Sequence, residues 1–476
     1  MAEVMSRGVW ITEAGGEREA RLRFLAERGL RLLMADVDPG GREALHFFDP
    51  YEGKTLHLLS PEGGGLLEKA SSIFPPAVRW WELIYGTVGE ETPSRRVVRD
   101  GIRGGKVRGG ETGLAAAPLL CGAGGELVLE TAGGRVLRVT EGLRPADSLS
   151  LREGKAVGDA ERAREALGGD FPLFISFLLA LEECRGCEVP LSARAVRAIL
   201  LELVRMRSHS SWLSAAAALG GHFRLSERLR LWGEEVAELA MSVTDGRGAA
   251  EAVILGGVRE EAASRVAEDL WKNMECMAGQ WAGLSRRLAD LSPPRWAERR
   301  LAGLPWTGSK VGRGGGLGCA KKRGVRGNWR GREAWVGPLA RALGNPRDAR
   351  AEDPALPTPP GWSPRLAEGR KGNLRRMLEV RAGEVKDSLA LIEALLRKPP
   401  GGPWEGPRGR RGTGRGFGRC EGPEGETCCH LVLEKGRVAH VAFSRPREVN
   451  RSAARCLEGA WLDEAAELLP LLLPHK

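Results

Sequence analysis

The chain has 476 residues, of which 42% are hydrophobic and 28% are charged, and its formal net charge is +10. This length allows two or three domains with their own cores, and the composition is that of a globular protein rather than a disordered or fibrous one. The sequence contains no run of about 18 apolar residues, which argues against a membrane-spanning helix. No apolar segment follows Ser6-Arg7, so we expect no secretory leader. Nine irregularly spaced cysteines indicate reduced thiols, and we expect a cytoplasmic protein.

Two segments carry much of the positive charge. Residues 307–332 hold eight Lys or Arg and no acidic residue, and residues 408–419 hold five arginines among glycines. Such segments attract nucleic-acid phosphates or an acidic protein, although a solvated basic loop is the commoner case. A nucleic-acid-associated binding protein is therefore the second of two function hypotheses.

Strand and helix signals alternate through the first sixty residues. The pattern predicts a helix at 17–28 and strands at 9–12, 30–37, 44–50 and 54–61. This order is typical of a small α+β domain. Glycine-rich residues 101–125 are predicted as a linker, and residues 126–139 as a hairpin that turns at Gly133-Gly134.

Residues 174–259 hold the strongest helical periodicity. We predict a first helix that ends at Glu183, and a second that begins at Pro190 with Ser192 as its N-cap and runs to about Ala218. A third helix, capped by Ser226, ends near residue 243.

The second of these helices carries a polar stripe. Its apolar face contains Val196 and Ile199, whereas Glu202, Arg205 and His209 follow at i, i+3 and i+7 on another face. A polar stripe on an otherwise buried helix is costly unless it is used, so these residues form the candidate functional site.

A series of short motifs follows in a fixed order along this region. They are Ala180-Leu181-Glu182, Gly186, Val189-Pro190, Arg194, Leu201-Glu202, Arg205, Ser208-His209, Gly220 and Gly256-Gly257-Val258-Arg259. Their order resembles that of the D-type (49-kilodalton) subunit of NADH-quinone oxidoreductase. It equally resembles that of the related large subunit of membrane-bound energy-converting nickel-iron hydrogenases of the formate-hydrogenlyase type.

Later stretches keep the same family order. They are the Gly-Pro loop at 335–350, a long helix at 372–397, and a hairpin at 421–450 in which Glu424 stands where the family has an arginine. Residues 71–86 are similar to the end of the C-type (30-kilodalton) subunit. The resemblance therefore implies a fused C-type and D-type chain.

This resemblance implies an α+β fold with three parts. Residues 1–105 would form the C-type α/β domain, 106–155 a glycine-rich linker and hairpin, and 156–476 a D-type, hydrogenase-large-subunit-like domain. The last part would hold a central helical bundle with peripheral β hairpins.

The resemblance also implies the function and the partners. The chain would be a peripheral subunit on the cytoplasmic face of a membrane oxidoreductase that handles NADH, quinone or hydrogen, beside an iron-sulfur small subunit and membrane subunits. It places Glu202, Arg205, Ser208 and His209 at the electron-transfer interface, with His209 beside the partner's cluster. An imidazole with an ordinary pKa near 6.5 gains a proton within reach of working pH. Gly256, Gly257, Val258 and Arg259 would form a pocket loop.

Both chemistries of the family lack residues here. A nickel-iron site needs four thiolates, but the one CxxC pair, Cys184 and Cys187, falls between two helices, and residues 468–476 contain no cysteine. The quinone-binding tyrosine is replaced near Leu167, and the hairpin histidine is missing. We therefore expect no metal or other cofactor bound by this chain, and a subunit whose catalysis is altered or lost. Cys428-Cys429-His430 lies on a predicted strand, where neighbours face opposite ways, which argues against a metal site there.

Overall fold

The computed structural model describes residues 2–4, 8–12, 18–38, 41–49, 52–60, 65–74, 112–115, 126–132, 134–142, 160–167, 169–244, 246, 248–301, 335–352, 356–358, 362, 374–397, 399, 401–410, 412–446 and 450–472. Helices and mainly antiparallel sheets share this part of the chain, which confirms the α+β prediction. Most of the C-type motif, from residue 75 on, and the basic segment 307–332 lie outside the described residues. No helix in the described part is long and apolar enough to cross a membrane.

The N-terminal domain is a five-stranded sheet with two helices. Its elements are β1 (Ala2–Val4), β2 (Gly8–Thr12), α1 (Arg18–Glu27), β3 (Arg31–Val37), β4 (Glu43–Asp49), β5 (Lys54–Leu59) and α2 (Leu66–Ile73). The strand order is β1-β2-β5-β4-β3, with β2 and β5 parallel and the other pairs antiparallel. The predicted helix and four strands are confirmed, and β1 is an addition that the pattern did not predict.

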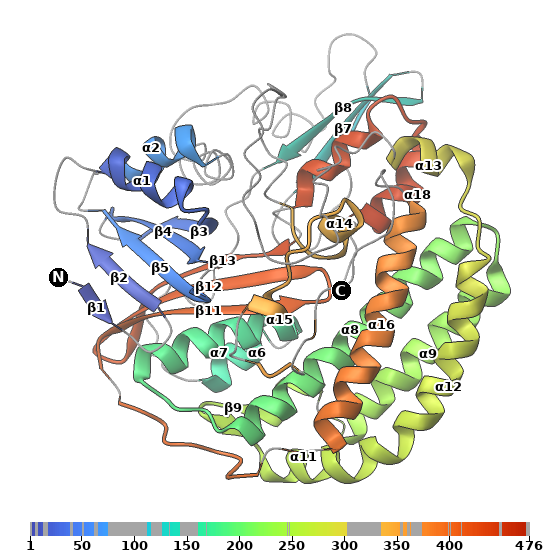
Figure 1. The fold of residues 1–476 in the computed structure, drawn as a ribbon. Coiled ribbons are helices and arrows are strands. Elements are labelled where there is room, and N and C mark those ends of the chain that lie inside the picture. The colour runs from blue at the N-terminus through green and yellow to red at the C-terminus, as the bar shows by residue number, and fades with distance from the viewer. Residues whose placement is uncertain are drawn as a thin grey trace.

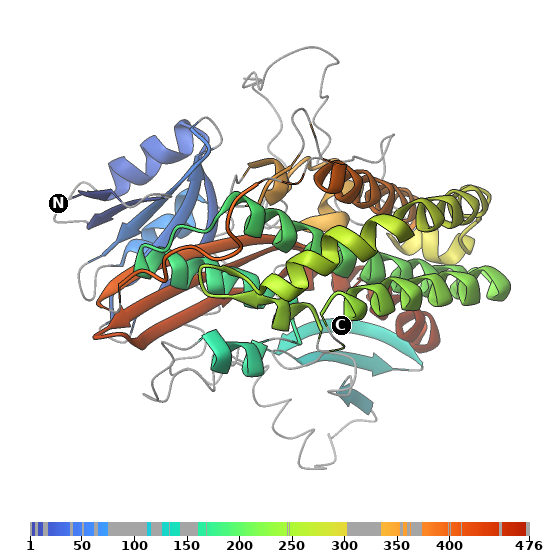
Figure 2. The ribbon, with the colours of Figure 1, turned by 90° about the horizontal axis from the view of Figure 1, so that it is seen from below.

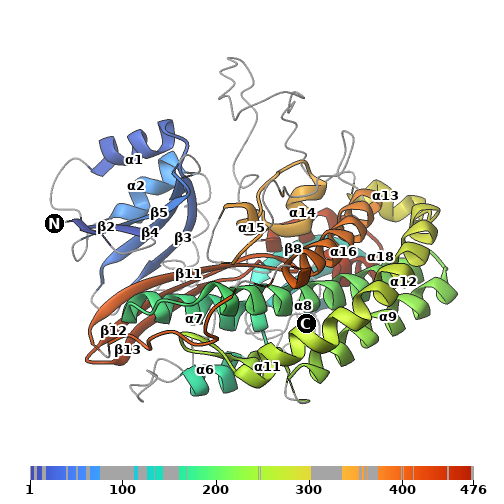
Figure 3. The ribbon, with the colours of Figure 1, turned by 60° about the horizontal axis from the view of Figure 1, so that its bottom comes forward.

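Both faces of this sheet are covered. Leu45, Phe47 and Leu58 pack with the residues of α1 and α2 on one face. Ala44 and Phe48 lie on the opposite face of β4, because alternate residues of a strand face opposite ways, and they pack with Phe417 from the C-terminal part of the chain. The domain therefore rests on a second sheet by its helix-free face, as Figure 3 shows.

A small sheet follows the N-terminal domain along the chain. It consists of β6 (Thr112–Ala115), β7 (Glu126–Ala132) and β8 (Arg135–Gly142), in that order. The hairpin of β7 and β8 is confirmed, with Gly134 at a φ of 76° in its turn. Residues 101–125, predicted as a linker, contain the strand β6, which pairs with β7.

Four helices begin the large domain: α6 (Ala160–Leu167), α7 (Phe171–Arg185), α8 (Leu191–Leu219) and α9 (Phe223–Ser242). The three predicted helices are therefore present, but two predicted caps are wrong. Ser192 lies inside the first turn of α8 and its hydroxyl donates to the Pro403 carbonyl at 2.5 Å. Ser226 lies inside α9, where its hydroxyl is 3.0 Å from that of Ser214. Tertiary hydrogen bonds thus use both hydroxyls.

The chain then returns along the bundle. The next elements are α10 (Ala249–Ala252), β9 (Val253–Ile254), β10 (Gly257–Val258), α11 (Glu260–Arg265), η1 (Val266–Leu270), α12 (Trp271–Ala289), α13 (Arg295–Leu301), α14 (Gly337–Ala342), α15 (Ala349–Glu352) and α16 (Leu374–Arg397). The predicted long helix at 372–397 is confirmed as α16. Helices α8, α9, α12 and α16 pack together as elongated rods (Figures 1 and 2).

A three-stranded antiparallel sheet lies between the bundle and the N-terminal domain. It is formed by β11 (Gly414–Gly422), β12 (Gly425–Glu434) and β13 (Arg437–Ser444), and η2 (Arg451–Leu457) and α18 (Leu462–Leu472) follow it. The predicted hairpin from Glu421 is confirmed. Helix α7 packs directly on the glycines of β11. A Cβ atom on Gly416 would lie 2.0 Å from the Ala180 carbonyl oxygen, and one on Gly418 would lie 1.8 Å from the Ser176 carbonyl oxygen.

Candidate functional site

The predicted polar stripe on α8 lies in the protein interior. Glu202 is 3% exposed, and Arg205 and His209 are fully buried. The carboxylate of Glu202 accepts a hydrogen bond from Arg205 Nε at 3.1 Å, as their spacing of three residues on a helix predicts. Arg205 and His209 therefore contact other residues of this same chain, and neither reaches the surface.

Glu202 is held by cations and a hydroxyl from remote segments. Arg350 Nη1 donates to it at 3.1 Å, and the Ser388 hydroxyl on α16 donates at 2.5 Å. Burial opposes ionisation, but Arg205 and Arg350 outweigh it and hold the pKa of Glu202 below its usual value. The buried carboxylate is thus charged and paired.

Arg205 joins α8 to the end of β11. Its two terminal nitrogens donate to the carbonyl oxygens of Glu421 at 2.6 Å and Gly422 at 2.8 Å. A guanidinium has five donors in a fixed fork, so one side chain binds both the carboxylate on its own helix and two peptide groups of the sheet.

His209 lies between a carboxylate and a guanidinium. Its Nε2 is 2.8 Å from Glu384 and its Nδ1 is 3.0 Å from Arg381 Nη1. Because arginine can only donate, Nδ1 accepts, and the proton of the neutral ring is on Nε2 and is donated to Glu384. Burial, assisted by Arg381 and Arg205, lowers the pKa of His209 to about 4, against the opposite effect of Glu384. The imidazole is therefore neutral near pH 7, and the expected pKa near 6.5 is not met.

Arg341 on α14 links the remaining acids of the cluster. It contacts Glu384 at 2.7 Å, Glu421 at 3.0 Å and Asp348 at 3.1 Å, and all four side chains are buried. Burial and the nearby Asp348 charge raise the pKa of Glu421 to about 7, although Arg341 counteracts them. The cluster thus contains one carboxyl group that can exchange a proton near neutral pH.

The negative charge of Glu424 in the hairpin turn, where the resemblance predicts an arginine, is balanced by Arg381. Its two oxygens accept hydrogen bonds from Arg381 at 2.5 Å and 2.9 Å, and one also accepts from the Ser208 hydroxyl at 3.2 Å. The Glu424 side chain is 26% exposed, and Ser208 is half-buried. These two side chains are therefore the solvent-facing edge of the cluster that contains His209.

The predicted pocket loop, Gly256 to Arg259, is a tight turn packed against the chain itself. The Gly256 amide donates to Glu182 at 2.9 Å, and the Val258 amide donates to the Trp404 carbonyl at 2.9 Å. A Cβ atom on Gly257 would lie 2.2 Å from the Trp404 carbonyl oxygen, so this position needs glycine. Arg259 Nε donates to the Glu251 carbonyl at 2.8 Å. The loop is thus held by hydrogen bonds to other parts of the chain. Its role toward a substrate stays a prediction.

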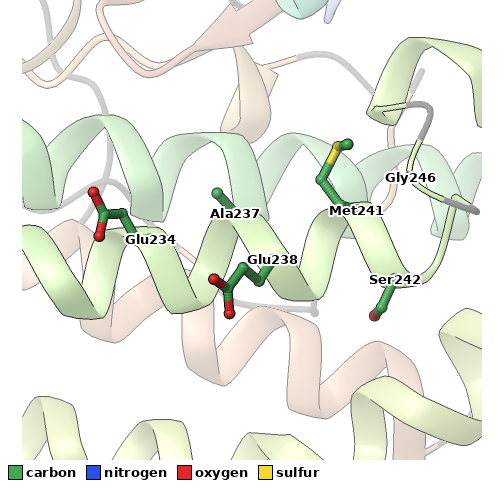
Figure 4. A pocket seen from close by; sticks show the side chains of 6 residues that line it. All are labelled: Glu234, Ala237, Glu238, Met241, Ser242 and Gly246. Carbon is green, nitrogen blue, oxygen red and sulfur yellow. The ribbon is translucent and has the colours of Figure 1, made fainter.

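A hollow of about 420 Å³ lies elsewhere, along α9. Figure 4 shows its lining: Glu234, Ala237, Glu238, Met241, Ser242 and Gly246. None of the predicted site residues lines it, and its side chains present no nucleophile and base in contact.

The thiols of the cysteine pair at the end of α7 contact two different carbonyl oxygens. The Cys184 thiol donates to the Leu431 carbonyl at 3.5 Å and the Cys187 thiol to the Arg408 carbonyl at 3.0 Å. Burial raises the pKa of both thiols, that of Cys187 to about 11. Both are therefore protonated near pH 7, whereas a metal ligand must be a thiolate.

The basic segment 408–419 is in part a buried strand. From Gly414 on it forms β11, and Arg419, which is 3% exposed, pairs with Glu352 and Glu426. The prediction of a loop is wrong for this half, because the glycines serve contact with α7 rather than flexibility. Arg408, with its side chain 71% exposed, remains on the surface.

The sequence predicted the members of the buried cluster that lie on α8, but not the residues from other segments that complete it. The residues that complete it are Arg341, Asp348, Arg350, Arg381, Glu384, Ser388, Glu421 and Glu424. Most of them lie in stretches that keep the family order, and this shared order was the available signal. No spacing rule connects α8 with α16 or with the hairpin.

Comparison with known proteins gives sequence and fold relatives. No model of a known protein family matches the chain. It is 29% identical over 238 residues to formate hydrogenlyase subunit 5 of Escherichia coli (strain K12), a match covering 48% of this chain and 36% of the relative. It is 28% identical over 317 residues to the membrane-bound hydrogenase subunit alpha of Pyrococcus furiosus, covering 62% of this chain and 67% of the relative.

The fold is shared with a chain of the membrane-bound sulfane sulfur reductase, an archaeal respiratory membrane complex. The TM-score is 0.58 at 19% sequence identity, and the match covers 78% of this chain and 98% of that one. The matched region spans little more than a third of the Escherichia coli relative. The chain is therefore similar in sequence to a formate hydrogenlyase subunit and to a membrane-bound hydrogenase subunit, and in fold to a chain of a respiratory membrane complex.

Proposed function

We propose that the chain is a peripheral subunit of a membrane-bound, hydrogenase-related or complex I-like oxidoreductase on the cytoplasmic face of a membrane, docked against a small subunit that carries an iron-sulfur cluster. The observation that carries this proposal is the similarity in sequence to a formate hydrogenlyase subunit and a membrane-bound hydrogenase subunit, with which the similarity in fold to a chain of a respiratory membrane complex agrees. Residues 1–105 would be the C-type part of a fused C-type and D-type chain. Handling of NADH or quinone would belong to the complete assembly.

We further propose that this chain binds no nickel-iron centre. Among the described cysteines, Cys184 and Cys187 are neutral thiols bonded to two different carbonyls, and Cys276 on α12 is exposed. Cys420, Cys428 and Cys429 are buried in the β11–β13 sheet, Cys456 lies in η2, and no three of the cysteines in the described part of the chain converge on one point. The described residues do not fit the group, and no reaction step is assigned to it.

The buried cluster would take part in electron transfer through charge rather than direct contact. His209 is fully buried, so the iron-sulfur cluster of a partner subunit would act on it through Arg381 and Glu424. The Glu424 side chain reaches solvent. A negative charge that develops at the partner raises the pKa of a neutral imidazole, and Glu421 already titrates near pH 7. When the iron-sulfur cluster of the partner is reduced, Glu421 would therefore take up a proton first, and His209 only after it.

Co-purification tests the assembly. The tagged chain, expressed from its own genomic neighbourhood and extracted in mild detergent, should bring with it an iron-sulfur protein and membrane subunits. Elemental analysis of the isolated chain should show far less than one nickel per molecule. Isolation of the chain alone from its native membranes, or one nickel per chain, would overturn the corresponding part of the proposal.

The reduction potential of the partner's iron-sulfur cluster tests the proposed interface. In the purified complex, Glu421→Gln should reduce the pH slope of that potential around pH 7, and His209→Gln should leave the slope near pH 7 unchanged. His222→Gln, on an exposed residue, is the matched control. Equal slopes in all variants would show that the cluster is structural.

A further inference from the structure

Five ionisable side chains meet where the N-terminal sheet packs on β11–β13, away from the α8 cluster. Asp36, His46 and His57 lie on β3, β4 and β5, and His430 and His440 lie on β12 and β13. All five are buried, with exposures between 0% and 6%. The face-to-face packing of two sheets thus brings residues from opposite ends of the chain into one polar cluster.

Asp36 is the centre of this cluster. Its Oδ2 lies 2.7 Å from His430 Nδ1 and 3.0 Å from His440 Nε2. Its Oδ1 has no hydrogen-bond partner in the described part of the chain and lies 3.6 Å from His46 Nε2. Burial opposes ionisation, but the histidines, His430 foremost, hold the pKa of Asp36 well below its usual value. A buried carboxylate of this kind needs a cation, and the ion pairs that reach it from described residues come from imidazoles alone.

The second nitrogen of His46 is oriented by a relay. His46 Nδ1 is 2.8 Å from His57 Nδ1, and His57 Nε2 is 3.1 Å from the Thr55 hydroxyl. When His46 Nδ1 donates to His57, and His57 Nε2 donates to Thr55, the lone pair of His46 Nε2 faces Asp36 Oδ1. In this tautomer two acceptors face each other in the interior and need a positive charge between them, whereas in the other tautomer His46 Nε2 would donate to Asp36. Metal-binding histidines are commonly oriented in this way by a hydrogen bond at the other ring nitrogen.

The spacing fits a shared ion. Two ligands about 2.0–2.1 Å from a tetrahedral zinc ion are about 3.4 Å apart, close to the observed 3.6 Å between Asp36 Oδ1 and His46 Nε2. Ligand atoms of Asp36, His46 and His430 all lie within 4.8 Å of one another. We propose that Asp36, His46 and His430 bind a zinc ion that fastens the N-terminal domain to the β11–β13 sheet, and that His440 orients the carboxylate through its contact with Asp36 Oδ2.

The surroundings favour a structural ion over a catalytic one. Phe417 stacks on His46 with ring centroids 4.6 Å apart and an interplanar angle of 17°, and apolar residues of both sheets close the rest. Nitrogen and carboxylate donors suit zinc. Because the donors come from two domains, the ion can be enclosed only when the domains dock, so its binding contributes to folding.

This site departs from the expectation that the chain binds no metal. Cys429 and His430 do face opposite ways on β12, since Cys429 packs toward α7 and His430 toward the N-terminal domain. Asp36 lies 394 residues from His430 in the sequence, and no local motif joins the two.

The test uses the full chain, stripped of metal with a chelator and returned to zinc chloride. Elemental analysis after gel filtration should give one zinc per chain, and zinc should raise the midpoint of thermal unfolding by at least about 3 °C. His46→Gln and His430→Gln should each lower zinc affinity by more than about a hundredfold, beyond the loss of about tenfold to a hundredfold expected for the orienting residue in His57→Ala. The control His222→Gln, on an exposed histidine, should bind zinc like the wild type.

Two wild-type measurements serve if these variants fail to fold. Cobalt chloride should give the visible absorption bands of a tetrahedral site. The X-ray absorption spectrum of the zinc protein should show nitrogen and oxygen ligands and no sulfur at about 2.3 Å. A sulfur ligand would place the zinc on the cysteines and overturn the proposal. Stoichiometry far below one, or unchanged affinity in both glutamine variants, would instead show a purely hydrogen-bonded cluster.

Discussion

The buried neutral His209 should make the protein sensitive to acid in a predictable range. Its pKa falls from an ordinary 6.5 to about 4 in the folded chain, because burial outweighs the attraction of Glu384. The unfolded chain therefore takes up a proton before the folded chain does as pH falls. Stability from this residue is fully present above pH 6.5 and is lost progressively down to about pH 4.

The magnitude follows from the two pKa values. The full shift corresponds to about 3 kcal/mol, and about 2 kcal/mol of it is lost between pH 7.5 and pH 5. His209→Gln keeps a donor for Glu384 and an acceptor for Arg381 but cannot titrate. The variant should lose about 2 kcal/mol less than the wild type over this pH interval, whatever its own stability at pH 7.5.

Urea unfolding followed by tryptophan fluorescence at pH 7.5, 6.5, 5.5 and 5 measures the effect. Other titrating groups, such as buried His46, act equally in both proteins and cancel in the comparison. His222→Gln, on an exposed histidine, should follow the wild-type pH dependence. If the His209→Gln curve runs parallel to that of the wild type, then His209 is not held neutral by burial and the reasoning fails.

Three further predictions concern packing, thiol reactivity and a helix cap. Gly418→Ala should destabilise the chain by about 3 kcal/mol or more, because its Cβ would lie 1.8 Å from a carbonyl oxygen of α7, whereas Gly412→Ala, with nothing within 4 Å, should change the urea midpoint little. Maleimide at pH 7.5 should label exposed Cys276 far faster than Cys187, whose pKa is raised to about 11, as peptide mass spectrometry would show. Asp170→Ala should cost about 1 kcal/mol in thermal unfolding, because Asp170 accepts from the Leu173 amide at the start of α7; an unchanged midpoint would exclude this cap.

The helices and most strands of the described chain were predictable from local pattern. Helix α8 follows from its apolar spacing, and the same spacing placed Glu202, Arg205 and His209 on one face. The two wrong N-caps show the limit of this reasoning, since Ser192 and Ser226 bond to other parts of the chain instead.

The polar contacts of the domain junction could not be predicted from β4. Every residue of β4 is buried, because one face meets α1 and α2 and the other meets a second sheet. A strand covered on both faces shows no alternation of polar and apolar residues, so nothing local marks His46 as part of a polar cluster.

The sequence by itself determined which residues share a helix face or a strand, because these relations depend on repeats of 3.6 and 2 residues along the chain. Tertiary structure alone decided that Glu202 meets Arg350 and Ser388, 148 and 186 residues away, and that His209 meets Glu384. It also decided the charge state of His209, because a pKa depends on removal from water and on charges brought near by packing. Local periodicity contains neither quantity.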